Sequence, residues 1–181
     1  MSFRDNKMNK IGTTITLDQV EQRLCCHVAK VRFTENRRNG VENSLNKHLS
    51  WTQEATVQID LDGYGGELAF CRLFNIYPDF TVHLRSTGED KGDAKLPCGL
   101  AVDVKSTKYK NGNLITGIWK DDNTDLYALM VGEFPTYTFM GFMRKEDLRR
   151  EGRVGDLGYG PTYIAPQEDL TELEEVKWKQ K

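Results

Sequence analysis

Residues 93–107 read Asp-Ala-Lys-Leu-Pro-Cys-Gly-Leu-Ala-Val-Asp-Val-Lys-Ser-Thr, and this stretch predicts a β-hairpin. In its second half every second residue from Leu100 to Val104 is apolar, which is typical of a strand with one buried face. We therefore expect Asp103 and Lys105 to project together from the other face, about 7 Å apart along the strand.

The turn of this hairpin determines which residue lies opposite Asp103. Residues 96–99 are Leu-Pro-Cys-Gly, and a turn centred on Cys98 places Asp93 across from Asp103. Carboxylates opposed at about 5 Å would repel each other by about 3 kcal/mol at an effective dielectric constant of about 20. Because a bound divalent cation turns this repulsion into attraction, the pattern favours a metal-dependent phosphodiesterase site. The alternative is a half-exposed hairpin whose charges face water.

The acid-x-Lys spacing of residues 103–105 also occurs elsewhere in the chain. It recurs at residues 5–7, 89–91 and 175–177, but none of these lies in an alternating apolar run after a turn. The context therefore singles out residues 103–105.

Asp93, Asp103, Lys105 and an upstream helix carrying Glu67 resemble the PD-(D/E)XK nuclease superfamily, which has the restriction-endonuclease-like fold. By the order of elements the resemblance covers about residues 63–131. It implies an α/β fold with a mixed β-sheet of about four to six strands flanked by helices. It also implies a Mg-dependent deoxyribonuclease, of the kind found among phage and recombination or repair enzymes.

The resemblance implies a role for each residue of the pattern. Asp93 and Asp103 carry hard oxygen ligands that suit Mg²⁺ or Mn²⁺, and the family pattern adds the backbone carbonyl of Val104. Lys105 would orient the attacking water or stabilise charge on the phosphate. Glu67 would hold a second ion or position the nucleophile.

Two of these positions have alternatives. The proline of the family pattern is missing before Asp93, whereas Pro78 precedes Asp79, which makes Asp79 a rival first carboxylate. The hairpin register favours Asp93. Glu67 follows two glycines and is predicted in the first turn of its helix, where any carboxylate complements the helix dipole.

Length and charge limit the kinds of partner. The chain has 181 residues, 38% hydrophobic and 29% charged, without a shift in composition, so we expect one domain over residues 1–181. A net charge of −2 means that contact with nucleic acid must come from local patches. Two patches are predicted to contact DNA phosphates, with Lys108, Lys110, Arg149 and Arg150. For each patch the alternative is a solvated charged face.

Cysteines and apolar runs suggest a location in the cell. The four cysteines have no paired CxxC spacing and no histidines at ligand intervals, so neither a zinc site nor a disulfide framework is predicted. No apolar run approaches the roughly 20 residues that span a bilayer, and the N-terminus lacks the apolar region of a signal peptide. We expect a soluble cytoplasmic protein, in the host cytoplasm if the chain is viral, without a membrane partner.

Helices and strands are expected on both sides of the hairpin. Residues 16–19 have capping-box spacing and precede a stripe of apolar residues: Leu17, Val20, Leu24, Val28 and Val31. Residues 1–50 are thus expected as a helical N-terminal extension, with a second short helix over 41–51. Further strands are predicted at 80–85, 114–119, 126–131, 137–143 and from 162 toward Pro166. Residues 172–181 are expected to fray.

Two hypotheses for the function follow. The first is a nuclease that hydrolyses DNA phosphodiesters with weak sequence specificity or with selectivity for DNA structure. The second is a non-catalytic module on the same fold that binds nucleic acid or protein. The joint presence of Asp93, Asp103 and Lys105 favours the enzyme. The choice between DNA and RNA, the strandedness of the substrate and the formation of a homodimer stay open.

Overall fold

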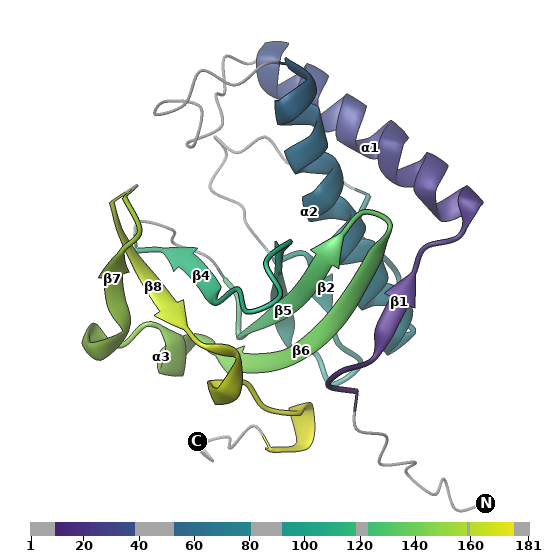
Figure 1. Ribbon diagram of the computed structural model, residues 1–181. Helices are drawn as coiled ribbons and strands as arrows, with labels where there is room; N and C mark the ends of the chain where they lie inside the picture. The colour runs from purple at the N-terminus through teal and green to yellow at the C-terminus, as the bar shows by residue number, and fades with distance from the viewer. Residues whose placement is uncertain (1–9, 39–52, 81–91, 119–122, 159, 176–181) are drawn as a thin grey trace, which may run out of the picture.

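The computed structural model describes residues 10–38, 53–80, 92–118, 123–158 and 160–175 (Figure 1). Its long helices are α1 (Gln19–Arg38) and α2 (Gln53–Phe74), and α3 (Lys145–Leu148) is a single turn. The strands are β1 (Thr14–Thr16), β2 (Ala94–Lys95), β3 (Ala101–Thr107), β4 (Leu114–Gly117), β5 (Leu126–Glu133), β6 (Thr136–Arg144), β7 (Val154–Asp156) and β8 (Pro161–Ala165). Short 3-10 turns cover Glu151–Arg153, Gln167–Asp169 and Leu173–Glu175.

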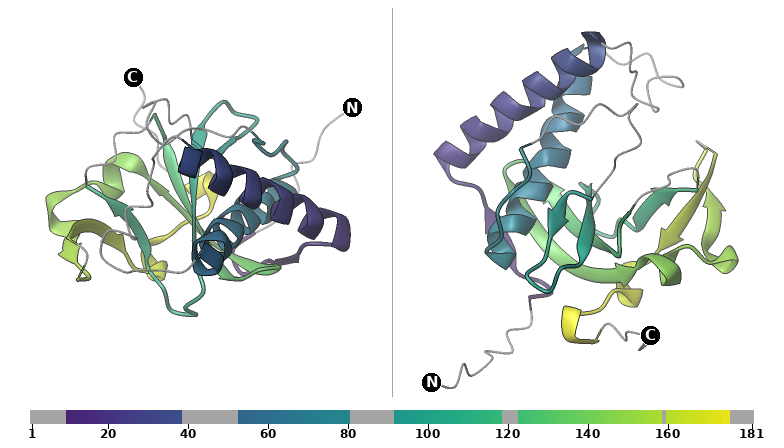
Figure 2. Two further views of the ribbon diagram at one scale, coloured as in Figure 1. Left: turned by 90° about the horizontal axis from the view of Figure 1, so that it is seen from above. Right: turned by 180° about the vertical axis from the view of Figure 1, so that it is seen from behind.

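The strands form two sheets. The first has five strands in the order β1-β6-β5-β3-β2, and it is mixed because β3 and β5 are parallel while the other neighbours are antiparallel. The second sheet has the order β4-β8-β7. Figures 1 and 2 show α2 across one face of the first sheet with α1 beside it, and the second sheet set apart from both helices. The prediction of a mixed α/β sheet is confirmed, but among the described residues both long helices lie on the same face.

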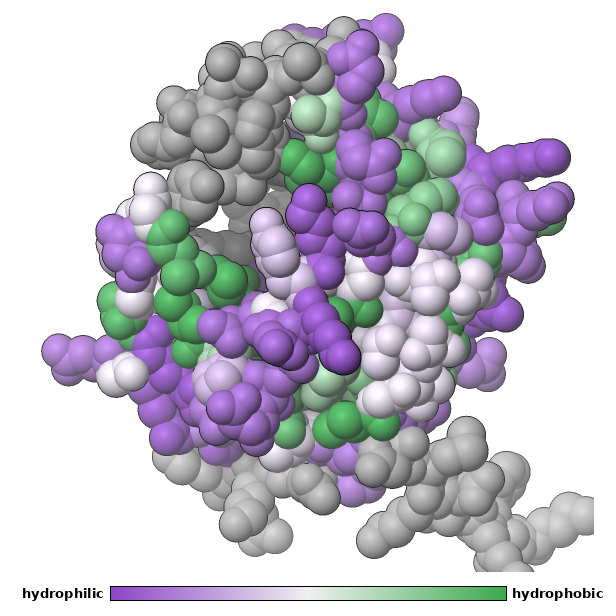
Figure 3. All heavy atoms as spheres, viewed as in Figure 1, coloured by the Kyte–Doolittle hydropathy of each residue, from purple (hydrophilic) through white to green (hydrophobic). Residues whose placement is uncertain are grey.

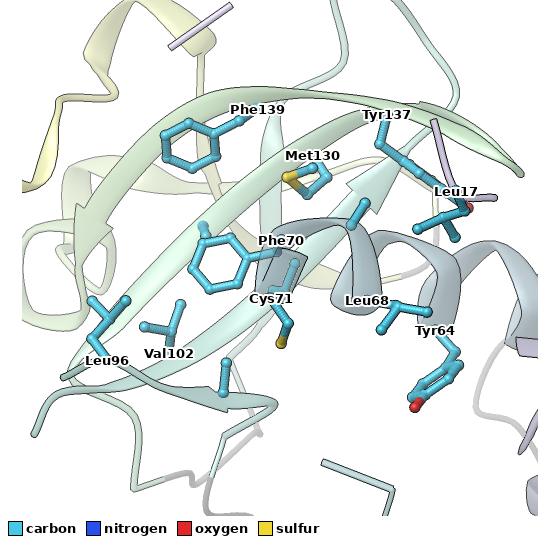
Figure 4. Close-up of a cluster of buried hydrophobic side chains, with 14 of the residues drawn as sticks. Leu17, Tyr64, Leu68, Phe70, Cys71, Leu96, Val102, Met130, Tyr137 and Phe139 are labelled. Atoms are coloured by element: carbon cyan, nitrogen blue, oxygen red, sulfur yellow. The ribbon is translucent and has the colours of Figure 1, made fainter. Parts of the chain in front are cut away.

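The main core lies between α2 and the first sheet. It centres on an aromatic cluster, which consists of Phe70, Phe74, Phe139 and Phe142. Figure 4 shows Phe70 and Cys71 of α2 directed toward side chains of the sheet. A second, smaller core on the opposite face joins Tyr127 and Leu129 of β5 to Leu114 of β4. Burying both faces of β3 and β5 makes the middle of the sheet the most enclosed part of the molecule.

The β2–β3 hairpin has the predicted register. Ala94 pairs with Val102, and the Leu96 N–H donates to the Leu100 carbonyl over 2.9 Å. The alternative interpretation, a half-exposed hairpin whose charges face water, does not describe Asp103, since its side chain is 1% exposed. Asp103 is covered because β3 is an interior strand that has a packed layer on each face.

The helix that carries Glu67 begins earlier than predicted. Gly65 and Gly66 lie inside α2, so Glu67 is not in a first turn, and the helix-dipole interpretation of its charge is wrong. A Cβ atom on Gly65 would lie 2.5 Å from Tyr137 Oη, and one on Gly66 would lie 3.0 Å from Ser106 Cβ. These glycines let the helix approach the sheet closely.

The first helix also differs in its start and in its buried face. Its N-cap is Asp18, whose Oδ1 accepts the N–H groups of Val20 (2.8 Å) and Glu21 (2.9 Å), while Glu21 Oε2 accepts the Asp18 N–H (2.7 Å). This capping box lies two residues after the predicted one at 16–19. The predicted apolar stripe is only partly buried: Val20 is 74% exposed, whereas Cys25, Val28 and Ala29 are buried.

The remaining strand predictions divide into two groups. Strands near 126–131 and 137–143, and a strand that leads into a short helix at Pro166, are confirmed by β5, β6 and β8. The strand predicted over 114–119 is present as β4 but belongs to the second sheet. The helix over 41–51 and nearly all of the strand over 80–85 lie outside the described residues. Of the tail predicted to fray over 172–181, residues 176–181 lie outside them too, whereas Glu172 accepts the N–H groups of Lys10 and Ile11 and Leu173–Glu175 form a 3-10 turn. No described helix has the length and apolar character that a membrane span requires.

Candidate functional site

Three carboxylates from separate parts of the chain lie within electrostatic reach of one another. We call Glu67, Asp93 and Asp103 the acidic cluster. Glu67 comes from the middle of α2, Asp103 from β3, and Asp93 from the residue just before β2. They influence one another electrostatically: burial raises the pKa of Asp93 most, and the negative charges of Glu67 and Asp103 each raise it further. The structure therefore brings together the three acids that the sequence analysis selected.

Asp103 and Lys105 form an ion pair through Oδ1 and Nζ. Both project from the same face of β3, as the alternation predicts. The Asp103 side chain is 1% exposed, whereas that of Lys105 is 28% exposed. The lysine can thus reach a ligand in solvent while it remains bonded to the buried acid.

Asp93 marks the point where the hairpin ladder ends. Gly92 has a φ of +82°, and the Asp93 N–H donates to the Val102 carbonyl over 2.8 Å. The side chain of Asp93 then takes the place of a backbone partner, because its Oδ2 accepts the Val104 N–H over 2.7 Å. This bond fixes the carboxylate beside the β3 residues on which the predicted chemistry depends.

Burial and like charge together disfavour ionisation in the acidic cluster. Burial raises the pKa of Asp93 well above its usual range, and the neighbouring acids add to this, whereas Lys105 and the Val104 N–H lower it. The pKa of Glu67 is also raised, mainly by burial and further by Asp103, while Arg32 and Lys105 oppose the shift. Among the described residues, the cations that oppose these shifts are Arg32 and Lys105.

Arg32 is a member of this site that the sequence analysis missed. From α1 it donates Nη1 to both carboxylate oxygens of Glu67, at 3.3 and 3.4 Å, and its guanidinium lies 4.7 Å from the centroid of the Tyr64 ring. The charges of Glu67 and Asp93 raise the pKa of Arg32, although burial opposes them. The signal in the sequence was an arginine one turn after Val28, on what proves to be the buried face of α1.

The donor atoms of the acidic cluster fit a hard divalent cation. All are carboxylate oxygens, which Mg²⁺ and Mn²⁺ prefer. Cys71 lies close by, but burial and then the charges of Glu67, Asp93 and Asp79 raise its pKa to about 12, so it stays a thiol rather than a thiolate ligand. Among the described residues no three His, Cys, Asp or Glu side chains are already placed around one metal position. Mg²⁺ needs only one or two carboxylates beside water and phosphate oxygens.

The rival carboxylate, Asp79, lies in the same neighbourhood, because it influences the Cys71 thiol together with Asp93. Asp93, in addition, bonds to the strand that carries Asp103 and Lys105, by accepting the Val104 N–H. Asp93 therefore remains the better candidate for the first carboxylate.

The residues predicted to contact nucleic acid fall into two pairs. Lys108 and Lys110 are exposed in the turn that follows β3. Arg149 is half-buried and donates from Nε (3.1 Å) and Nη2 (2.9 Å) to Tyr127 Oη, and Arg150 is paired with Asp147. Lys108 and Lys110 are thus more accessible to a polyanion than Arg149 and Arg150, whose guanidinium groups bond to other side chains.

Comparison with known families matches residues 7–138 to a family of unknown function, DUF5843. No curated protein and no solved structure matches the chain. Inference about activity therefore depends on the geometry of the site.

Proposed function

This chain belongs to the DUF5843 family, a family of unknown function, and we propose that the protein is a metal-dependent nuclease that hydrolyses DNA phosphodiester bonds. The observation that carries the proposal is the acidic cluster beside Lys105. Carboxylates that lie close together in a buried place destabilise the fold. A function in binding a cation and a phosphate explains why they are present.

Each residue of the site has a proposed role that follows from its position. Asp93 and Asp103, with the backbone carbonyl of Val104, would hold Mg²⁺ or Mn²⁺, and Glu67 would hold a second ion or orient the attacking water. A bound divalent cation supplies charge neutralisation at the phosphate and makes water a better nucleophile near neutral pH. Lys105 Nζ, partly exposed and anchored by Asp103, would stabilise the negative charge that develops on the phosphate.

Arg32 acts on the site through Glu67. Its two contacts hold the Glu67 carboxylate in one orientation and favour its ionised form. It is therefore a positioning residue, which links α1 to the chemistry on the hairpin.

The test is incubation with labelled single-stranded, duplex and branched DNAs and a matched RNA, with Mg²⁺ or Mn²⁺ and with EDTA. We expect cleavage of at least one DNA with metal and none in EDTA. Asp103→Asn keeps the side-chain volume but removes a ligand charge, so its single-turnover rate should fall by about 10³-fold or more while DNA affinity persists.

Asp125→Asn is the matched control. Asp125 Oδ2 also accepts a backbone N–H of β3, that of Ala101 at 2.8 Å, but its side chain lies on the surface outside the acidic cluster. Its cleavage rate should match that of the unmodified protein. Binding of DNA without cleavage under all these conditions would favour the non-catalytic module, and cleavage of RNA alone would correct the substrate.

A further inference from the structure

The turn between β3 and β4 presents an aromatic ring between two lysines. Tyr109 is 69% exposed, and Lys108 and Lys110 on either side of it are exposed as well. Lys108 Nζ lies 5.8 Å from the centroid of the Tyr109 ring. In Figure 1, and from behind in Figure 2, the chain that leads into β4 lies between α2 and the second sheet.

Hydrogen bonds at its base hold this turn in one conformation. The Gly112 N–H donates to the Tyr109 carbonyl over 2.8 Å, and Gln167 Nε2 donates to the carbonyls of Lys110 (3.0 Å) and Gly112 (2.8 Å). A Cβ atom on Gly112 would lie 2.5 Å from Thr107 Cγ2, so the turn is also tightly closed. Tyr109 is thus held outward by a fixed backbone, which reduces the entropy lost when the ring binds a ligand.

The position of the ring relates it to the candidate active site. Tyr109 follows directly on the strand that carries Asp103 and Lys105. At about 3.3 Å per residue it lies within roughly 13 Å of Lys105 along the chain. A nucleic-acid strand with its phosphate at Lys105 would therefore pass Tyr109 within a few nucleotides.

The chemistry of the turn fits a nucleic-acid strand better than a protein or a lipid surface. Exposed aromatic rings stack on bases, and flanking lysines contact the phosphates on both sides of a stacked base. The face of a base in a duplex is already covered by its neighbours. Away from the ends of a duplex, only an unpaired base can offer its face to Tyr109.

We propose that Tyr109 is a stacking platform for an unpaired base and that Lys108 and Lys110 bind the adjacent phosphates, so that the substrate carries a single-stranded segment next to the site of cleavage. This inference rests on the proposed nuclease function and names its substrate class. It selects single-stranded, frayed or branched nucleic acid over continuous duplex.

The test is equilibrium binding measured by fluorescence anisotropy with the full chain in EDTA, so that the result does not depend on cleavage. The probes are a labelled oligothymidylate of about 20 nucleotides and a blunt duplex of the same length. We expect tighter binding of the single strand. Tyr109→Ala should raise its dissociation constant about tenfold and change that of the duplex less than about twofold. Tyr109→Phe should bind like the unmodified protein, because stacking does not need the hydroxyl group.

Two further variants separate stacking from charge and from general surface effects. Lys108→Ala should lower the slope of log Kd against log salt by about 0.7 for the single strand, whereas Tyr109→Ala should leave this slope unchanged. Tyr77→Ala removes another exposed tyrosine, 83% exposed and far along the chain, and should change neither affinity.

The inference is overturned if the single strand binds no better than the duplex, or if Tyr109→Ala binds it like the unmodified protein. It is also overturned if Tyr109→Phe loses as much affinity as Tyr109→Ala. Stacking on Tyr109 without any cleavage would refute the nuclease instead, and cleavage of single-stranded DNA that is insensitive to Tyr109→Ala would refute only the stacking platform.

Discussion

The aromatic cluster around Phe70 and the acidic cluster around Glu67 lie less than one turn apart on α2, yet they contribute to folding with opposite signs. Phe70 is fully buried, and its ring centroid lies 4.6 Å from that of Phe74 and 5.9 Å from that of Phe142. Glu67 is 15% exposed and lies among other acids that raise its pKa. The part of α2 around Phe70 buries apolar rings that need no polar partner, whereas the part around Glu67 lies among carboxylates that repel one another.

The difference shows which region is built for stability and which for binding. Apolar packing of rings lowers the free energy of the folded state without any ligand. Buried carboxylates near one another raise this free energy until a cation arrives. A fold that needed only to be stable would fill both positions with apolar residues.

The largest expected effect on stability comes from a change in the aromatic cluster. Phe70→Ala should lower the free energy of unfolding by about 3–5 kcal/mol, because it removes a buried ring from the aromatic cluster. Urea unfolding followed by circular dichroism measures this loss. Val20→Ala on the exposed face of α1 is the control and should change the free energy by less than about 0.5 kcal/mol. Equal losses in the two variants would show that α2 does not pack as described.

Removing a cation from the acidic side should also destabilise the protein. Arg32→Gln leaves Glu67 without its ion pair in a mostly buried place, and we expect a loss of about 1–3 kcal/mol near neutral pH. The loss should shrink as the pH falls and Glu67 takes up a proton. Urea midpoints at several pH values test this, and a loss that does not vary with pH would assign Arg32 a role in packing alone.

Removing an anion from the acidic cluster should instead raise the free energy of unfolding, and this is the smallest of the three expected effects on stability. Because the folded state raises the pKa of Asp93, its contribution is most favourable below the unfolded value of about 4 and is lost as the pH rises through the raised value. Asp93→Asn resembles the protonated acid and can still accept the Val104 N–H. In EDTA it should therefore raise the free energy of unfolding by about 1 kcal/mol near pH 8.

The acidic end of the pH range completes this test. Below about pH 4 the variant and the unmodified protein should unfold alike. Asp125→Asn, with the same type of bond to β3 but outside the acidic cluster, should not change the free energy of unfolding at either pH. A destabilised Asp93→Asn near pH 8 would mean that the Asp93 charge supports the fold.

Local patterns of the sequence predicted the hairpin and several strands. The register of β2 and β3 follows from a short turn and from apolar alternation, both of which are local. The same holds for the long strands β5 and β6. The placement of Asp93 beside the strand that carries Asp103, and so the centre of the candidate site, was accessible for this reason.

Features that depend on distant contacts were missed. Gly65 and Gly66 indicated the start of a helix, whereas they are small because Tyr137 and Ser106 press against α2. Arg32 was missed because its partner Glu67 lies 35 residues away on another helix, which no local pattern indicates. The second sheet was missed because an apolar run can indicate a strand but does not identify the strand with which it pairs.

The most direct test of the central claim is thermal unfolding of the full chain near pH 8 as Mn²⁺ is titrated. If the acidic cluster binds a divalent cation, the melting temperature should rise steadily with Mn²⁺ concentration, since only the folded state holds the ligands together. The rise should be much smaller in Asp103→Asn and unchanged in Asp125→Asn. A melting temperature that does not respond to Mn²⁺ up to about 10 mM, or that rises equally in all three proteins, would contradict the account.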